Sequence, residues 1–162
     1  MKPRTPTRVL LLLMLLSLCY SVEDIRFIVE EARAAGLKVA AHCLTERGAR
    51  NAAEGGVASI EHGLRMSDET LAVAKRNGVV LVGTDFPEKT AGYLGAGPEV
   101  ARVFHTLFLD RLKRAYKVGV TMAYGTDAFF MVPGETRGAL ALQYLIHMPP
   151  LRSFGLFRTS RL

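Results

Sequence analysis

Two similar phrases stand side by side in the stretch GLKVAAHCLTERGARNAAEGGVASIEHG, residues 36–63. Each begins at a glycine, Gly36 or Gly56, and reaches a histidine six positions later, His42 or His62. An apolar run of strand length follows each glycine, and residues compatible with a helix lie between the two runs. The stretch is therefore typical of two parallel strands joined by a helix.

The same alternation continues before and after this stretch. Apolar spacing and capping residues predict helices at residues 21–36, 45–55, 67–77, 98–118 and 135–146. Short apolar runs predict strands at residues 37–42, 57–62, 79–85 and 120–127. Strands that are apolar on nearly every residue belong to parallel sheets covered by helices, so the predicted fold class is α/β.

Three polar side chains stand at the carboxyl ends of these predicted strands. Each strand starts after a glycine that ends a helix. Residues that lie the same number of positions after these glycines are therefore predicted to lie at the same level along neighbouring strands. His42 and His62 share offset six, and Asp127 lies at offset eight from Gly119, at the end of the fourth strand. Parallel α/β folds build their sites at this end of the sheet.

The chemistry of these three residues favours a metal site. Imidazole nitrogens and carboxylates are ligands of zinc and related divalent ions, and the Asp127 carboxylate is also a candidate general base. For each histidine taken singly, the alternative is a hydrogen-bonded residue of the core. The matched offsets of His42 and His62 favour the metal site over that alternative.

The segments VAAHCLTERGARNAAEGGVASIEHG and VTMAYGTDA resemble the second half of the metal-dependent amidohydrolase superfamily, in the branch of imidazolonepropionases and metal-dependent prolidases. The likeness covers residues 23–145. It implies a partial (β/α)8 TIM-type barrel, with about strands five to eight and their helices. It also implies that His42, His62 and Asp127 bind one or two divalent ions, with zinc expected, and that Asp127 is the general base.

The resemblance further implies hydrolysis of carbon-nitrogen bonds in small amides, cyclic amides or dipeptides. The family's first-strand His-x-His pair and its bridging lysine on the fourth strand are absent from this sequence. A truncated form that is inactive by itself is therefore expected. The alternative is a non-catalytic, exported α/β fragment, or a half barrel that needs a second copy or a partner chain.

The N-terminal residues MKPRTPTRVLLLLMLLSLCYS have the layout of a secretory signal peptide, with a basic start, an apolar run and small residues near its end. The predicted organisation is a signal peptide at 1–22, a half barrel at 23–146 and an atypical basic tail at 147–162. Export is expected, and an uncleaved membrane anchor or a cytoplasmic chain are the alternatives.

Charge and the remaining polar residues add little. The net charge of +6 comes from the two ends of the chain, so no nucleic-acid partner is expected. His105 and Cys43 are expected to be structural, and Glu61 is expected to point away from His62. Asp85 is a lesser candidate for a residue that contacts substrate from the rim.

Overall fold

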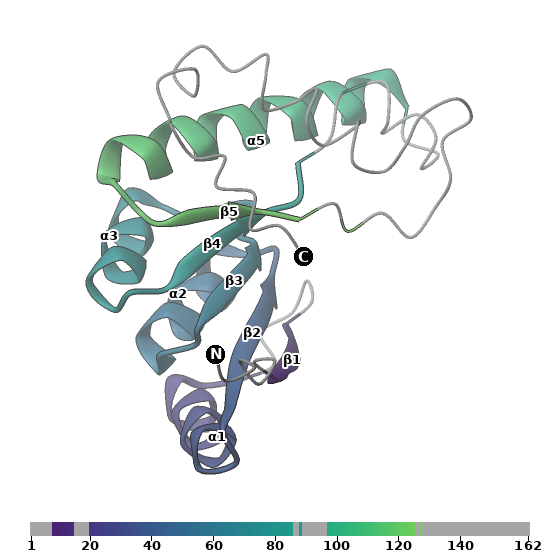
Figure 1. Cartoon of the computed structure of the whole chain (residues 1–162). Coiled ribbons are helices and arrows are strands. Elements are labelled where there is room, and N and C mark those ends of the chain that lie inside the picture. The colour runs from purple at the N-terminus through teal and green to yellow at the C-terminus, as the bar shows by residue number, and fades with distance from the viewer. Residues whose placement is uncertain (1–7, 15–19, 86–87, 89–96, 126, 128–162) are drawn as a thin grey trace, which may run out of the picture. The chain divides into compact units, whose positions relative to one another are not determined.

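The computed structural model describes residues 8–14, 20–85, 88, 97–125 and 127. Strands and helices alternate along the chain, as Figure 1 shows. The elements are β1 (Arg8–Met14), α1 (Val22–Ala34), β2 (Leu37–Cys43), α2 (Glu46–Gly55), β3 (Ser59–His62), α3 (Asp68–Arg76), β4 (Val80–Gly83), α5 (Pro98–Val118) and β5 (Met122–Tyr124).

The strands form one sheet in the order β1-β2-β3-β4-β5, and every neighbouring pair is parallel. Parallel neighbours require a crossover connection, and a helix lies between each strand and the next along the chain. The helices α1, α2 and α3 contact the sheet at β2, β3 and β4. The predicted α/β class with a parallel sheet is thus confirmed.

The chain divides into two compact units. The first unit contains residues 1–84 and 106–125, and therefore the five strands found among the described residues. The second contains residues 85–105 and 126–162, of which the structure describes 85, 88, 97–105 and 127. The predicted helix at 135–146 and the predicted tail at 147–162 lie outside the described residues.

The apolar run that was expected to be a signal peptide forms β1. Its residues pair with β2 from Arg8 opposite Leu37 to Met14 opposite Cys43, which adds a strand to the four that were predicted. An apolar run of this length suits a buried strand as well as the apolar part of a signal peptide. The signal peptide stays a prediction. No helix in the described part of the chain is long and apolar enough to cross a membrane.

The helices begin where the sequence signals place them. The Ser21 hydroxyl accepts a hydrogen bond from the Asp24 backbone N–H at 3.1 Å, and the Asp24 carboxylate accepts one from the Ser21 N–H at 3.0 Å. These two reciprocal bonds form a capping box at the start of α1. Thr45 and Ser67 cap α2 and α3 through their hydroxyl groups. These local interactions set where each helix starts after the preceding strand.

The hydrophobic core lies between the sheet and helices α1, α2 and α3, and Ala115 of α5 also belongs to it. Small residues let α2 approach its neighbours closely, and Gly55 is the tightest position, because an added Cβ would lie 2.3 Å from Ile25 Cγ2. The fully buried apolar side chains include Ile25, Ala41, Cys43, Ala49, Ala52, Ala53, Ile60 and Leu71. This packing sets the heights of the strand ends that carry the candidate site.

Candidate functional site

The two histidines of the repeated phrase meet at the ends of β2 and β3. Nδ1 of His42 lies 2.7 Å from Nε2 of His62, the ring centroids are 4.0 Å apart, and the ring planes cross at 77°. Both side chains are half-buried. The two imidazoles thus converge as the strand ends predicted, and their role as metal ligands stays a prediction.

The sheet register differs by one residue from the predicted equal heights. His42 is opposite Glu61, and His62 is opposite Cys43. Side chains of a strand alternate between the two faces, so a regular extended strand would point His62 to the same side as Cys43, away from His42. Counting residues from the glycines could not predict this one-residue shift. The count follows a single strand, whereas register depends on how two strands pack.

A tight turn at His62 brings its imidazole back to His42. The φ angle of His62 is 67°, in the left-handed region. The Gly63 N–H donates to the carbonyl oxygens of Glu61 at 2.9 Å and Cys43 at 3.0 Å, and the first of these bonds closes a three-residue turn around His62. This turn interrupts the alternation of β3 at its last residue. It therefore accounts for an imidazole contact that the register alone does not provide.

Gly63 is the last residue of this turn, and nothing larger fits there. Its φ angle is 55°, and an added Cβ would lie 2.6 Å from Leu81 Cδ1 and 2.7 Å from Met66 Sδ. Residues other than glycine rarely adopt this backbone conformation. Gly63, which follows the histidine in the sequence IEHG, is thus part of the turn that directs the imidazole toward His42.

A threonine directly after a third strand contacts the other nitrogen of His62. Thr84 directly follows β4, and its hydroxyl oxygen lies 2.5 Å from His62 Nδ1. The Thr84 hydroxyl is able to accept a hydrogen bond from Nδ1–H, which leaves the lone pair of Nε2 directed at His42. Thr84 was not singled out in the sequence, although its place at the end of a predicted strand was the signal that would have found it.

Cys43 is a structural residue, as expected. Its side chain is fully buried, and this burial, together with the nearby Glu61 carboxylate, raises the pKa of the thiol to about 12. A thiol that stays protonated at neutral pH is a poor nucleophile and a poor ligand. Glu61 accepts a hydrogen bond from the Ser59 hydroxyl at 2.6 Å, so its carboxylate is held by its own strand.

Asp127 lies in the second unit, and its side chain is exposed. Its φ angle is 44°, so Asp127 and His62 are the two described residues other than glycine with positive φ. A left-handed backbone at such residues costs free energy and is found preferentially at functional sites. Asp85, also in the second unit, is 1% exposed, and its contact with substrate stays a prediction. The assignment of Asp127 as ligand and base stays a prediction.

The two imidazole nitrogens that face each other are atoms of a type that binds divalent metals. Two nitrogens that each bind zinc at about 2.0–2.1 Å in tetrahedral geometry stand roughly 3.3 Å apart, so the pair must open by about 0.6 Å from its present 2.7 Å. Among the residues that the structure describes, no group of three His, Cys, Asp or Glu side chains is arranged to hold an ion. The described residues thus bring together two imidazoles, fewer side chains than a zinc site requires.

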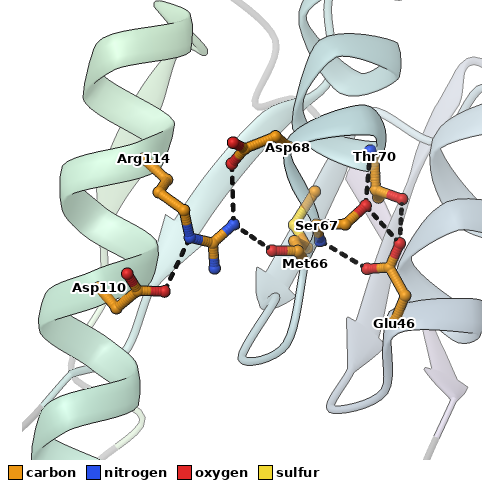
Figure 2. A network of polar contacts seen from close by, with 7 residues as sticks. All are labelled: Glu46, Met66, Ser67, Asp68, Thr70, Asp110 and Arg114. Carbon is orange, nitrogen blue, oxygen red and sulfur yellow. Dashed lines mark hydrogen bonds and ion pairs between the residues drawn. The ribbon is translucent and has the colours of Figure 1, made fainter.

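Charged side chains surround the loop that follows His62, residues 63–67. On one side, the Glu46 carboxylate accepts hydrogen bonds from the Ser67 N–H and hydroxyl, both at 2.7 Å, and from the Thr70 hydroxyl at 2.6 Å, as Figure 2 shows. Burial opposes ionisation of Glu46, but these hydrogen bonds and the Arg50 charge outweigh it and lower the pKa of the carboxyl. Glu46 thus ties the start of α2 to the start of α3.

On the other side, two arginines of α5 reach the same region. Arg111 donates to the carbonyl oxygen of His62, and Arg114 donates to the carbonyl oxygen of Met66 at 2.6 Å. Arg114 also pairs with Asp68 and Asp110 (Figure 2). Sequence reasoning missed both arginines, because basic residues on a long amphipathic helix are usually solvated and nothing in their spacing distinguishes them.

Comparison with known proteins places this architecture in a family. The family model described as "Amidohydrolase family" matches residues 18–160. The chain belongs to the amidohydrolase family. The match extends on both sides of the resemblance expected at 23–145, and it includes most of the segment expected to be an atypical tail. Family membership confirms the resemblance drawn from the two quoted motifs.

Relatives of this amidohydrolase-family chain are longer. It is 30% identical over 117 residues to uncharacterized proteins of Mycobacterium tuberculosis and Mycobacterium bovis, and the aligned part is 67% of this chain and 31% of those proteins. The chain thus spans about a third of the length of the curated relatives it matches.

Solved structures confirm the fold class, a part of a (β/α)8 barrel. Aspergillus niger ochratoxinase superposes with a TM-score of 0.68 at 27% identity, over 89% of this chain and 36% of that chain. A Xaa-Pro dipeptidase with bound methionine gives 0.60 at 29% identity, over 71% and 30%. A prolidase complexed with N-methylphosphonate-L-proline gives 0.59 at 27% identity, over 70% and 30%.

Proposed function

We propose that this chain forms part of a metal-dependent hydrolase that cleaves carbon-nitrogen bonds in amides, cyclic amides or dipeptides. One observation carries the proposal: two imidazoles from neighbouring strand ends face each other at 2.7 Å, and one of them is directed there by a strained turn. A histidine that serves only the core does not require a left-handed backbone, which costs free energy. Dipeptides are favoured among the substrates because similar structures include a prolidase and a Xaa-Pro dipeptidase.

We propose a role for each residue from the nitrogens that face each other. His42 Nδ1 and His62 Nε2 would hold the ion, and Thr84 would keep the proton of His62 on Nδ1 so that Nε2 is free to bind. When bound, the ion acidifies a water molecule and polarises the scissile carbonyl group. Asp127 would accept the proton of that water, an assignment that rests on the family resemblance. Zinc is the proposed ion because imidazole nitrogen suits it.

The remaining ligands are proposed to come from βα units outside this chain. The sheet favours this arrangement, since β1 and β5 are its terminal strands and each has a neighbour on one side only among the described strands. Such edges pair readily with further strands. A half barrel that binds a partner chain without catalysis is the second candidate, and the same two edges favour it.

Zinc binding tests the assignment. Calorimetry on the wild-type chain is expected to show weak binding, because two imidazoles are an incomplete ligand set, and His42→Ala and His62→Ala are each expected to weaken it at least tenfold. His105→Ala, which removes a histidine of α5, is the matched control and should bind as the wild type does. Equal affinity in the wild type and the His42→Ala, His62→Ala double variant would overturn the assignment.

Complementation tests the activity. The first four βα units of a family relative, supplied as a separate chain, are expected to produce dipeptide hydrolysis that the isolated chain lacks. The same mixture made with a His42→Ala, Asp127→Ala variant should remain inactive. Hydrolysis that is equal with and without these substitutions would rule out the proposed roles, and stable pairing without any hydrolysis would favour the half-barrel alternative.

A further inference from the structure

We propose that Arg111 and Arg114 of α5 are positioning residues that hold the turn at His62 and so keep its imidazole against His42. The proposal names residues for the proposed metal site and takes its catalytic meaning from that function. The positioning role can be measured on the imidazoles of His42 and His62 in the metal-free protein. Three sets of contacts support the inference.

The first is the contact between Arg111 and the turn. Arg111 is 0% exposed, and its guanidinium donates to the His62 carbonyl oxygen, which belongs to the residue with φ of 67°. The guanidinium also lies over the Phe108 ring, 5.9 Å from its centroid. Burying a cation is costly unless it is paired or hydrogen-bonded, so an apolar residue would be the ordinary choice at a position that needs only packing. The buried Arg111 instead bonds to the peptide that directs the imidazole.

The second is the contact between Arg114 and the loop. Arg114 lies three residues after Arg111, on the same face of α5, and donates to the Met66 carbonyl oxygen at 2.6 Å. Asp110 accepts from its Nε at 2.7 Å and Asp68 accepts from its Nη1 at 3.2 Å, so the guanidinium is oriented from both ends (Figure 2). Arginine offers several hydrogen-bond donors in fixed positions on one planar group, and lysine does not.

The third is the opposite side of the same loop. Glu46 accepts three hydrogen bonds from Ser67 and Thr70, directly after the residue that Arg114 contacts. The loop at 63–67 and the His62 carbonyl group before it are thus held by a carboxylate of α2 on one side and by two guanidinium groups of α5 on the other. Since His62 is directed by its backbone rather than by regular strand alternation, releasing the loop removes what keeps the ring in place.

Histidine tautomers are the direct readout. In the ¹⁵N-labelled full-length chain without metal, the ring nitrogens of His42 and His62 are expected to give shifts of fixed tautomers, because each faces a defined partner. Arg111→Met is expected to move the His62 signals toward the average of a free imidazole, Arg114→Met to move them in the same direction by less, and Arg111→Lys to restore part of the difference. Lys113→Met is the matched control, since Lys113 is an exposed cation between the two arginines, and it should leave the signals unchanged.

Zinc affinity is the second readout. Arg111→Met is expected to lower it at least tenfold, as loss of an outer-shell partner does, while Lys113→Met leaves it at the wild-type value. If Arg111→Met does not fold, Arg114→Met and Arg111→Lys decide, and unchanged His62 signals in both would overturn the proposal. Unchanged signals and affinity in folded Arg111→Met would also overturn it and leave the metal site standing. Shifted His62 signals in a chain whose wild type does not bind zinc would support the positioning role and reject the metal site.

Discussion

The ends of β2 and β3 carry the same residue type at matched places in the sequence, yet the molecule holds the two histidines in different ways. His42 lies within a regular strand, between Ala41 and Cys43, which are both fully buried. His62 lies in a left-handed turn, where Thr84 contacts its ring and Arg111 contacts its carbonyl oxygen. Core packing supports the first histidine, and polar contacts from distant segments support the second.

This difference predicts which substitutions should affect His62 without affecting His42. Packing is shared among many neighbours, so it tolerates the loss of one polar contact. A backbone held in an unfavourable conformation depends on the few groups that hold it. Changes near the loop at 63–67 should therefore disturb His62 while His42 stays in its strand.

The largest effect is expected from Gly63→Ala. A methyl group there meets Leu81 and Met66, and alanine disfavours a φ of 55°, so the free energy of unfolding should fall by about 3 kcal/mol. Urea denaturation measures this. Cys43→Ala, the corresponding change beside His42, is expected to cost about 1 kcal/mol because it leaves only a small cavity. Equal losses in the two variants would mean that the turn at His62 is no more demanding than the strand at His42.

Glu46→Ala should have an intermediate effect, near 2 kcal/mol at neutral pH, since it leaves the buried Thr70 hydroxyl and the Ser67 donors without their acceptor. Glu54→Ala, on the same helix, removes an exposed pair with Arg50 and should cost about 0.3 kcal/mol. Unfolding curves of both variants beside the wild type test the difference.

The pH dependence of the Glu46 effect has a definite sign. Folding lowers the pKa of this carboxyl, so its contribution is fully present above the ordinary glutamate pKa and is lost as the pH falls through the lower folded value. The difference in unfolding free energy between the wild type and Glu46→Ala should therefore shrink on acidification below about pH 4. A difference that stays constant from pH 7 to pH 3 would show that Glu46 acts through packing rather than through its charge.

Thr84→Val should cost about 1 kcal/mol of stability, less than Gly63→Ala or Glu46→Ala, because valine keeps the shape of threonine and loses only the hydroxyl group. Its effect on the site should be clearer: without the hydroxyl near Nδ1, the His62 ring nitrogens should lose their fixed tautomer, while the His42 shifts change less. Thr121→Val, at an exposed position, is the control. Equal changes at both histidines would show that they respond as one unit.

Most of the architecture followed from local signals. Ser21, Thr45 and Ser67 are the first residues of three predicted helices and act as their caps, because a capping hydroxyl bonds to backbone only three residues away. The strand after each helix was likewise marked by its apolar run. β1 was the exception, because an apolar run at the N-terminus has the composition of a signal peptide as well as that of a buried strand.

By itself, the sequence determined the parallel α/β order, the helix starts and the two histidines at neighbouring strand ends, since propensity, capping and periodicity act over a few residues. Only the tertiary structure decided the register step between His42 and His62, the turn that corrects for it, and the use of Arg111 to hold that turn. Register depends on how side chains of separate strands pack, and Arg111 reaches His62 across 49 residues of chain. No local sequence pattern predicts the register or the Arg111 contact, because both depend on segments that meet only in the folded chain.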